Sequence, residues 1–144
     1  MTFLVAAALA ALVAGSPVAG AGTQEKPKKP SLSLRATPNV GFTPIRIAFV
    51  VEVKGGPDDY EDFYCATIEW EWGDGTESEE SVDCEPYQAG KSEIRRRFMK
   101  DHRYHMADEY RVQFRLKKAG KVVGGASTSL RLRPGLQDIG SGLR

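Results

Sequence analysis

The sequence predicts an all-β protein, an antiparallel β-sandwich of about seven short strands in a single domain. Between Pro30 and Pro134, apolar residues recur at every second position, which is the period of a half-buried strand and not of a helix. Turn-forming residues separate these runs at intervals of roughly 8–12 residues, as in antiparallel sandwiches. The 144 residues are enough for one hydrophobic core.

The N-terminal segment has the composition of a secretory signal. Residues 1–21 carry no charge and are rich in Ala, Val and Leu, and Ala19-Gly20-Ala21 has the small-x-small pattern of a cleavage site. Residues 22–30, basic and proline-rich, would form a linker. We therefore expect a secreted, periplasmic or extracellular protein without stable membrane insertion after cleavage. No Lys or Arg precedes the apolar run, which departs from the usual signal pattern. An uncleaved N-terminal anchor stays an alternative.

The expected strands follow one another along residues 31–134. The clearest are residues 45–53, with large apolar side chains at odd positions, and residues 110–117, with apolar side chains at even positions. Weaker alternation is centred on Leu32 and Leu34, on Ile68 to Trp72, on Ile94 to Phe98, and on Leu130 and Leu132. The domain is thus expected to span residues 31–134. Residues 135–144, with three glycines, would form a flexible tail.

The two cysteines, Cys65 and Cys84, predict one disulfide. An exported protein meets oxidising conditions, and two cysteines with two histidines at these spacings are too few for a zinc site. Asp74-Gly75 between alternating runs favours a two-residue type I′ turn, in which residue i would face residue 149 − i. Cys65 would then face Cys84 directly, although a bulge in the turn would shift this register by one.

Residues 70–76, W-E-W-G-D-G-T, resemble the W-D-F-G-D-G-T signature of PKD (polycystic kidney disease) domains. His102-Arg103-Tyr104 is similar to the H-x-Y of that family, and the strand that begins at Glu109-Tyr110 is similar to its tyrosine strand. The resemblance covers about residues 31–133. The cysteine pair and the long acidic segment 55–64 depart from the pattern, as do Asp108 and Glu109 in place of a glycine.

The resemblance implies an immunoglobulin-like sandwich used as an extracellular spacer or binding module. It implies that Trp70 fills the core, that Asp74 holds the turn through backbone hydrogen bonds, and that Tyr110 occupies a tyrosine-corner position. The residues expected to carry this structural motif are Trp70, Trp72, Gly73, Asp74, Gly75, Thr76, His102, Tyr104 and Tyr110.

No catalytic, cofactor or metal site is expected from the motifs. His102 and His105 are the only histidines, and no nucleophile lies in a recognisable motif, so we do not expect an enzyme. The acidic loop at residues 58–62, with Asp58, Asp59, Glu61 and Asp62, offers oxygen ligands but lacks the spacing of a dedicated calcium loop. A calcium-dependent structural element using this loop is the alternative function.

The charges favour no nucleic-acid partner, because the formal net charge is only +1. In a PKD-like strand order, Arg111 and Arg115 would oppose Glu69 and Glu71 and neutralise them. Arginines near Arg131 would remain for an acidic polysaccharide or a protein. The sequence therefore predicts an exported, non-catalytic module for protein or carbohydrate binding, or for spacing, at the cell envelope.

Overall fold

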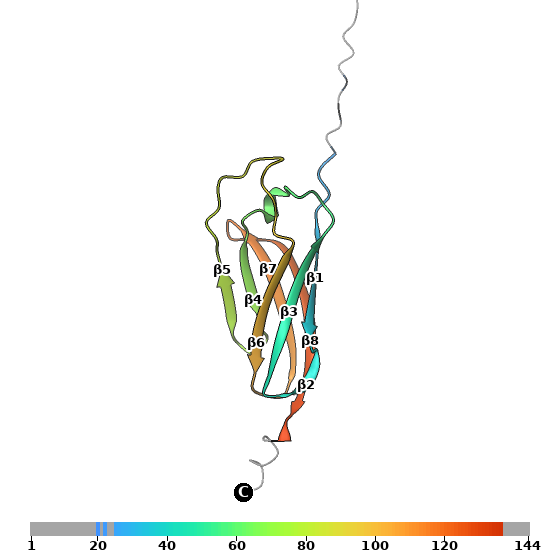
Figure 1. The fold of residues 1–144 in the computed structure, drawn as a ribbon, viewed down its shortest axis with the longest axis vertical. Helices are drawn as coiled ribbons and strands as arrows, with labels where there is room; N and C mark the ends of the chain where they lie inside the picture. The colour runs from blue at the N-terminus through green and yellow to red at the C-terminus, as the bar shows by residue number, and fades with distance from the viewer. Residues whose placement is uncertain (1–19, 21, 23–24, 137–144) are drawn as a thin grey trace, which may run out of the picture.

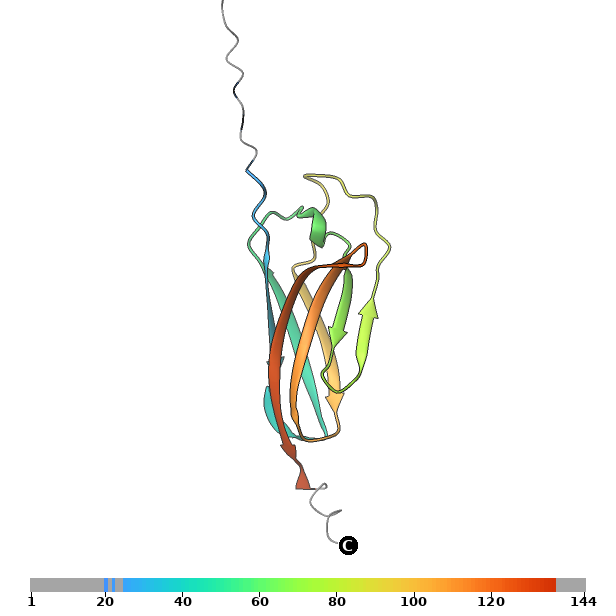
Figure 2. The same cartoon turned by 180° about the vertical axis from the view of Figure 1, so that it is seen from behind.

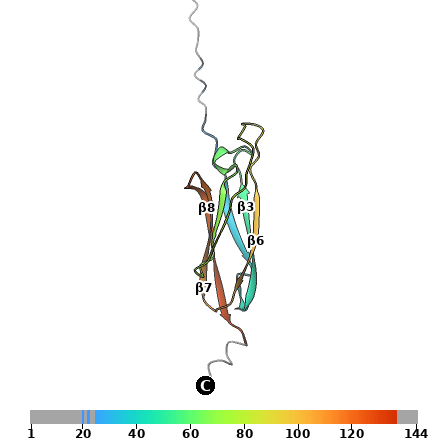
Figure 3. The ribbon, with the colours of Figure 1, turned by 90° about the vertical axis from the view of Figure 1, so that its left-hand side faces the viewer.

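The computed structural model describes residues 20, 22 and 25–136, and within them it is an all-β sandwich of two facing sheets (Figures 1 and 3). The predicted signal peptide, apart from Gly20, and residues 137–144 of the predicted tail lie outside the described residues. The predicted fold class is confirmed. The first strand begins at Ser31 and the last ends at Pro134.

Three strands form one sheet and five form the other. The three-stranded sheet has the order β1 (Ser31–Thr37), β3 (Ile45–Lys54), β6 (Arg97–Tyr104). The five-stranded sheet, nearer the viewer in Figure 2, has the order β2 (Val40–Thr43), β8 (Lys121–Pro134), β7 (Glu109–Lys118), β4 (Thr67–Glu71), β5 (Glu77–Glu80). A single 3₁₀ turn, Glu61–Phe63, precedes β4.

One strand pair departs from the purely antiparallel arrangement that was predicted. The chain leaves the three-stranded sheet after β1 and joins the five-stranded sheet as β2, which runs parallel to β8. The other pairs are antiparallel. Because β2 follows β1 after only two residues, it continues along the same edge of the sandwich on the other sheet.

The core lies between the sheets and is built from the alternating apolar positions. Odd residues of β3 and even residues of β7 point inward, as the period of two predicts; they include Ile47, Phe49, Val51, Val112, Phe114 and Leu116. Trp70 and Trp72 are each 1% exposed, and their ring centroids lie 5.1 Å apart in a stacked pair. The edge of the Trp70 ring also meets Phe114 at 4.9 Å.

The turn between β4 and β5 is not the type I′ turn that was predicted. Glu71 lies opposite Glu77 and Ile68 opposite Glu80, so the ladder is shifted by one residue from the expected register. Gly73 and Gly75, on either side of Asp74, have φ of 82° and 86°. The Trp72 N–H donates to the Thr76 carbonyl at 3.1 Å and closes a three-residue loop.

Cys65 and Cys84 form a disulfide, but not for the geometric reason expected. Neither cysteine belongs to the β4–β5 ladder, which runs only from Ile68–Glu80 to Glu71–Glu77. The bond instead joins two residues some way past the Ile68–Glu80 end of this ladder, whose Cα atoms lie 6.1 Å apart. It ties the segment that follows the 3₁₀ turn to the long loop between β5 and β6.

Candidate interaction surface

Asp74 and His102 connect the two sheets at the turn of the signature motif. One carboxylate oxygen of Asp74 accepts hydrogen bonds from the Thr76 N–H at 3.0 Å and hydroxyl at 2.5 Å. The other lies 2.7 Å from His102 Nε2 on β6. The His102 ring stacks on Trp72 with centroids 4.4 Å apart and planes 2° from parallel. The turn of one sheet is thereby fixed to a strand of the other.

Burial and hydrogen bonding act in opposite directions on the Asp74 carboxyl. Burial by itself raises its pKa, but the hydrogen bonds from His102 and Thr76 favour the charged form and leave the pKa of Asp74 below its ordinary value. The carboxylate that holds the turn is therefore ionised at neutral pH.

The two tyrosines of the motif anchor the same end of the sandwich from inside. Tyr104 donates its hydroxyl hydrogen to the Trp72 carbonyl at 2.9 Å, and burial raises the pKa of this hydroxyl. Tyr110 donates to the carbonyl of Met106, four residues upstream, at 2.6 Å, which is tyrosine-corner geometry. Both rings are buried, so these residues shape the interior of the domain at this end.

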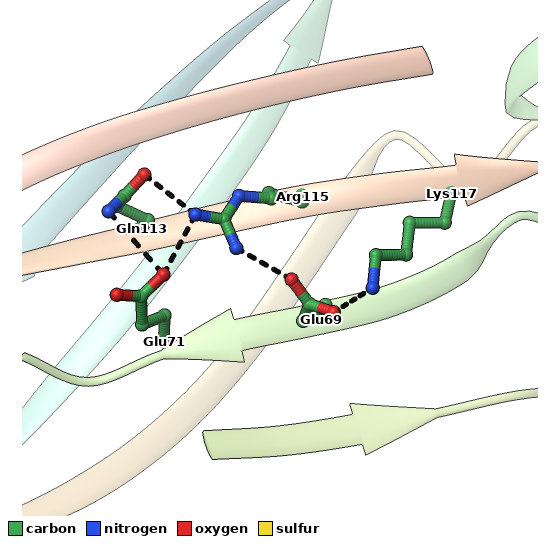
Figure 4. Close-up of polar contacts among 5 residues, drawn as sticks. All are labelled: Glu69, Glu71, Gln113, Arg115 and Lys117. Carbon is green, nitrogen blue, oxygen red and sulfur yellow. Dashed lines mark hydrogen bonds and ion pairs between the residues drawn. The ribbon is translucent and has the colours of Figure 1, made fainter. Parts of the chain in front are cut away.

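A network of charges runs along the outer face of the five-stranded sheet between β4 and β7 (Figure 4). Arg115 donates to Glu69 at 2.7 Å, to Glu71 at 2.8 Å and to the Gln113 side-chain oxygen at 3.0 Å. Lys117 donates to the second oxygen of Glu69. The hydrogen bonds from Lys117 and Arg115 lower the pKa of the Glu69 carboxyl.

Arg111 does not take the place in this network that was predicted for it. Glu71 lies opposite Gln113, and only the pairing of Glu69 with Arg115 agrees with expectation. Arg111 lies beyond the end of β4 and faces Ser129 of β8, and it donates to the hydroxyl of Ser127 at 3.2 Å. Because β4 ends at Glu71, no β4 carboxylate reaches the level of Arg111.

Arginines and apolar side chains meet where β2, β8 and β7 adjoin; we call Arg111, Arg131, Arg133, Val40 and Phe42 the arginine surface. The parallel ladder sets Val40 beside Arg131 and Phe42 beside Arg133. Val40 is 54% exposed and Phe42 is 65% exposed. The alternation of the strands explains this, because Leu130 and Leu132 turn inward while their neighbours turn outward.

A shallow hollow of about 460 Å³ lies in the arginine surface. Its lining includes Val40 of β2, the acidic residue Glu109, and the two arginines Arg111 and Arg131. Arg131 donates to Glu109 at 2.8 Å, and none of the ion pairs among the described residues involves Arg111 or Arg133. Among the described residues that line the hollow, Arg111 is therefore the arginine without an ion-pair partner, and Arg133 lies outside this lining on β8. The sequence indicated the arginines near Arg131 as binding residues. Val40 and Phe42 were not predicted, because β2 has only four residues, too few to show a clear apolar alternation.

The first two carboxylates of the acidic loop, those of Asp58 and Asp59, are hydrogen-bonded to other parts of the protein. Asp58 accepts hydrogen bonds from Arg96 at 2.6 and 3.1 Å, and Asp59 accepts one from the Gly90 N–H at 2.7 Å. In the part of the chain that the structure describes, no group of three or more His, Cys, Asp or Glu side chains is placed to hold a metal ion. The geometry gives the calcium alternative no support.

The two histidines have different surroundings. His102 stacks on Trp72 and forms a hydrogen bond with Asp74, whereas His105 is exposed in the loop after β6.

Among the described residues, no helix has the length and apolar character needed to cross a bilayer.

Comparison with solved structures places this geometry among known folds. The PKD domain of an M14-like peptidase from Thermoplasmatales archaeon SCGC AB-540-F20 matches with a TM-score of 0.50 at 13% identity, over 76% of this chain and 100% of that one. The fold is PKD-like. At this identity the likeness concerns the arrangement of the strands, and it agrees with the immunoglobulin-like sandwich that the motif implied.

Two further matches are structures of the CARDB domain of the PF1109 protein from Pyrococcus furiosus. The crystal structure, a complex with di-metal ions, has a TM-score of 0.45 at 11% identity and covers 76% of this chain and 96% of that one. The solution structure has a TM-score of 0.46 at 13% identity and covers 72% and 94%. No protein-family model matches the sequence, and no curated protein matches it.

Proposed function

We propose that the chain is an exported, non-catalytic binding module that takes an acidic polysaccharide at the cell envelope through the arginine surface. The observation that carries the proposal is the hollow of about 460 Å³ with Arg111 and Arg131 at its wall and the exposed Phe42 ring close by on β2. The PKD-like fold and the interior position of the motif residues favour a binding role over catalysis.

The chemistry of this surface suits a sugar acid. A guanidinium group presents paired N–H donors that match a carboxylate or sulfate, and an aromatic ring offers an apolar face on which a sugar ring can pack. Glu109 neutralises Arg131 only, so Arg111 and Arg133 keep their charge for a ligand. Val40 extends the apolar contact beside them.

Export is supported by the leader composition of residues 1–21 and by the Cys65–Cys84 disulfide, which forms and persists in oxidising compartments. Protein recovered from outside the cytoplasm should begin near Gly22 and contain no free thiol. Intact mass spectrometry with and without a thiol-alkylating reagent measures both properties. A chain that retains residues 1–21, or that takes up two alkyl groups, contradicts export with cleavage.

Binding to alginate, a polyuronate, tests the ligand class, with neutral dextran as the reference polymer. Affinity electrophoresis should show retardation by alginate, weakening as salt is raised, and none by dextran. Arg111→Gln combined with Arg133→Gln should weaken alginate binding about tenfold, since each exposed charge contact is worth about 1 kcal/mol or less. Phe42→Ser should weaken it independently of salt.

Arg103→Gln is the matched control, because Arg103 is exposed on the outer face of the three-stranded sheet. This variant should bind alginate as the unmodified protein does. Equal retardation by dextran, or alginate binding that survives loss of Arg111 and Arg133, would overturn the assignment.

A further inference from the structure

The outer face of the five-stranded sheet divides into an acidic half and a basic half. On β4 and β5 the ladder sets Glu71 opposite Glu77 and Glu69 opposite Glu79. Like charges directly opposite each other in an antiparallel pair repel. On β7 and β8 the outward charged side chains are mainly basic; they are Arg111, Arg115, Lys117, Arg131 and Arg133, with Glu109.

Within one chain, ion pairs neutralise the seam between the halves and the Arg131–Glu109 pair on β8 and β7. Arg115 and Lys117 pair with Glu69 and Glu71, as Figure 4 shows. Outside the seam, Glu77 and Glu79 on the edge strand β5 take part in none of the ion pairs among the described residues, and the same is true of Arg111 and Arg133. The face thus keeps two carboxylates and two arginines that form none of these ion pairs, although Glu79 lies near enough to Lys117 to contribute to its raised pKa.

The shape of the face allows a second sheet to approach. The outward positions in the middle of β8 are Gly125, Ser127 and Ser129, whose short side chains leave a low strip beside β7, on the side away from β4 and β5. Exposed Val40 and Phe42 add apolar area at the β2 edge. The five strands range from 4 to 14 residues, and at about 3.3 Å per residue and about 4.8 Å between strands they cover roughly 600 Å² per copy. Two copies would bury at most about 1,200 Å² in all, which meets the lower size of a specific interface.

We propose that two copies of this chain pair through this face, with Glu77 and Glu79 of each copy against Arg111 and Arg133 of the other. A two-fold axis makes every contact occur twice, so one complementary pair of patches neutralises all four unpaired charges per copy. The formal net charge of +1 means that the copies do not repel each other at long range. The partner that this face fits is therefore a second copy.

Sedimentation equilibrium of the purified protein tests the pairing. At about 0.05 M salt the protein should fit a monomer–dimer equilibrium, with an association constant that falls at least tenfold at about 0.5 M salt because screening weakens exposed ion pairs. The double variant Glu77→Lys with Glu79→Lys should be monomeric alone, and so should Arg111→Glu with Arg133→Glu. An equimolar mixture of the two variants should form a heterodimer, since every patch again meets its opposite.

The mixture also shows that both variants are folded, because unfolded chains would not restore a specific dimer. Arg103→Glu, on the outer face of the other sheet, should leave dimerisation unchanged. A wild-type monomer at all concentrations, a mixture that fails to pair, or assemblies that grow beyond the dimer would each overturn the proposal. The dimer and the proposed polysaccharide would use the same Arg111 and Arg133, so they would exclude each other at this surface. No polysaccharide enters this experiment, so a failure to dimerise leaves the proposed ligand standing, and a failure to bind alginate leaves the dimer standing.

Discussion

Trp70 illustrates how a single residue joins the two layers of the domain. Its ring lies 6.2 Å from Phe49 of the three-stranded sheet and 4.9 Å from Phe114 of its own sheet, and it is 1% exposed. Trp70→Ala should lower the free energy of unfolding by about 3–5 kcal/mol, through lost contacts and a residual cavity. Urea unfolding followed by circular dichroism measures the loss. An unchanged midpoint would mean that Trp70 does not support the core.

Glu69 should make stability depend on pH in the acidic range. Its folded-state pKa is lowered by Lys117 and Arg115, so its contribution is present above the unfolded pKa, about 4.3, and is lost as pH falls through the folded pKa. Between pH 7 and pH 3, the Glu69→Gln protein should therefore lose less stability than the unmodified protein does. Urea midpoints at both pH values provide the comparison.

Glu85→Gln is the control for this experiment, because Glu85 is exposed in the loop after β5 and takes part in none of the ion pairs among the described residues. It should show the acid sensitivity of the unmodified protein. If Glu69→Gln is as acid-sensitive as the Glu85 variant, the ion pairs of Glu69 contribute nothing to stability.

At the scale of elements, the turn after β4 depends on glycine for two different reasons. Gly73 and Gly75 both have positive φ, but a Cβ on Gly73 would lie 2.6 Å from the Arg111 carbonyl oxygen, while none of the protein lies within 4 Å of a Cβ on Gly75. Gly75→Ala should cost about 1–2 kcal/mol from backbone strain alone. Gly73→Ala should cost a further 1–3 kcal/mol, roughly, from the clash with β7.

Thermal melts of the two alanine variants, each compared with the unmodified protein, measure this difference. The open position makes Gly75→Ala a direct control for strain. Equal losses would show that β7 yields to the added methyl group and that the close approach at Gly73 is not rigid.

Strands with strong apolar alternation were predictable from the sequence. Strands that form only because a neighbouring strand supplies backbone hydrogen bonds were not. β3 and β7 carry large apolar residues at every second position and bury them. β5 reads Glu-Ser-Glu-Glu and is a strand because β4 offers it a ladder. In β6, the polar residues Lys100 and His102 occupy the inward positions, where an apolar residue would be expected. Their hydrogen bonds to Glu80 and Asp74 explain why polar side chains are accepted there.

For the molecule as a whole, the Cys65–Cys84 disulfide should raise stability without being essential for the fold. It closes a segment with a sequence separation of 19 and lies outside the core between the sheets. Reduction should lower the free energy of unfolding by about 3 kcal/mol, mainly by freeing the unfolded chain. Melts with and without reductant measure this, with Cys65→Ser/Cys84→Ser as a reductant-insensitive control.

A melt that does not change on reduction would contradict this role. It would show that the β4–β5 ladder and the long loop after β5 hold their places without the covalent bond. Complete unfolding on reduction would instead contradict the independence of the core from the bond.

The sequence by itself determined the period of two, the tryptophan motif and the identity of the disulfide partners, because these depend on the order of residues along one strand or on a count of two cysteines. The tertiary structure alone decided the ladder register. With positive φ at Gly73 and Gly75 the loop has three residues instead of two, and composition does not reveal this difference. It also decided which charges remain unpaired. Arg111 has no opposing carboxylate because β4 ends two residues before the level of Arg111. Phe42 lies exposed because β2 pairs with the distant strand β8, and this pairing turns the Phe42 side chain to the outer face of the sheet.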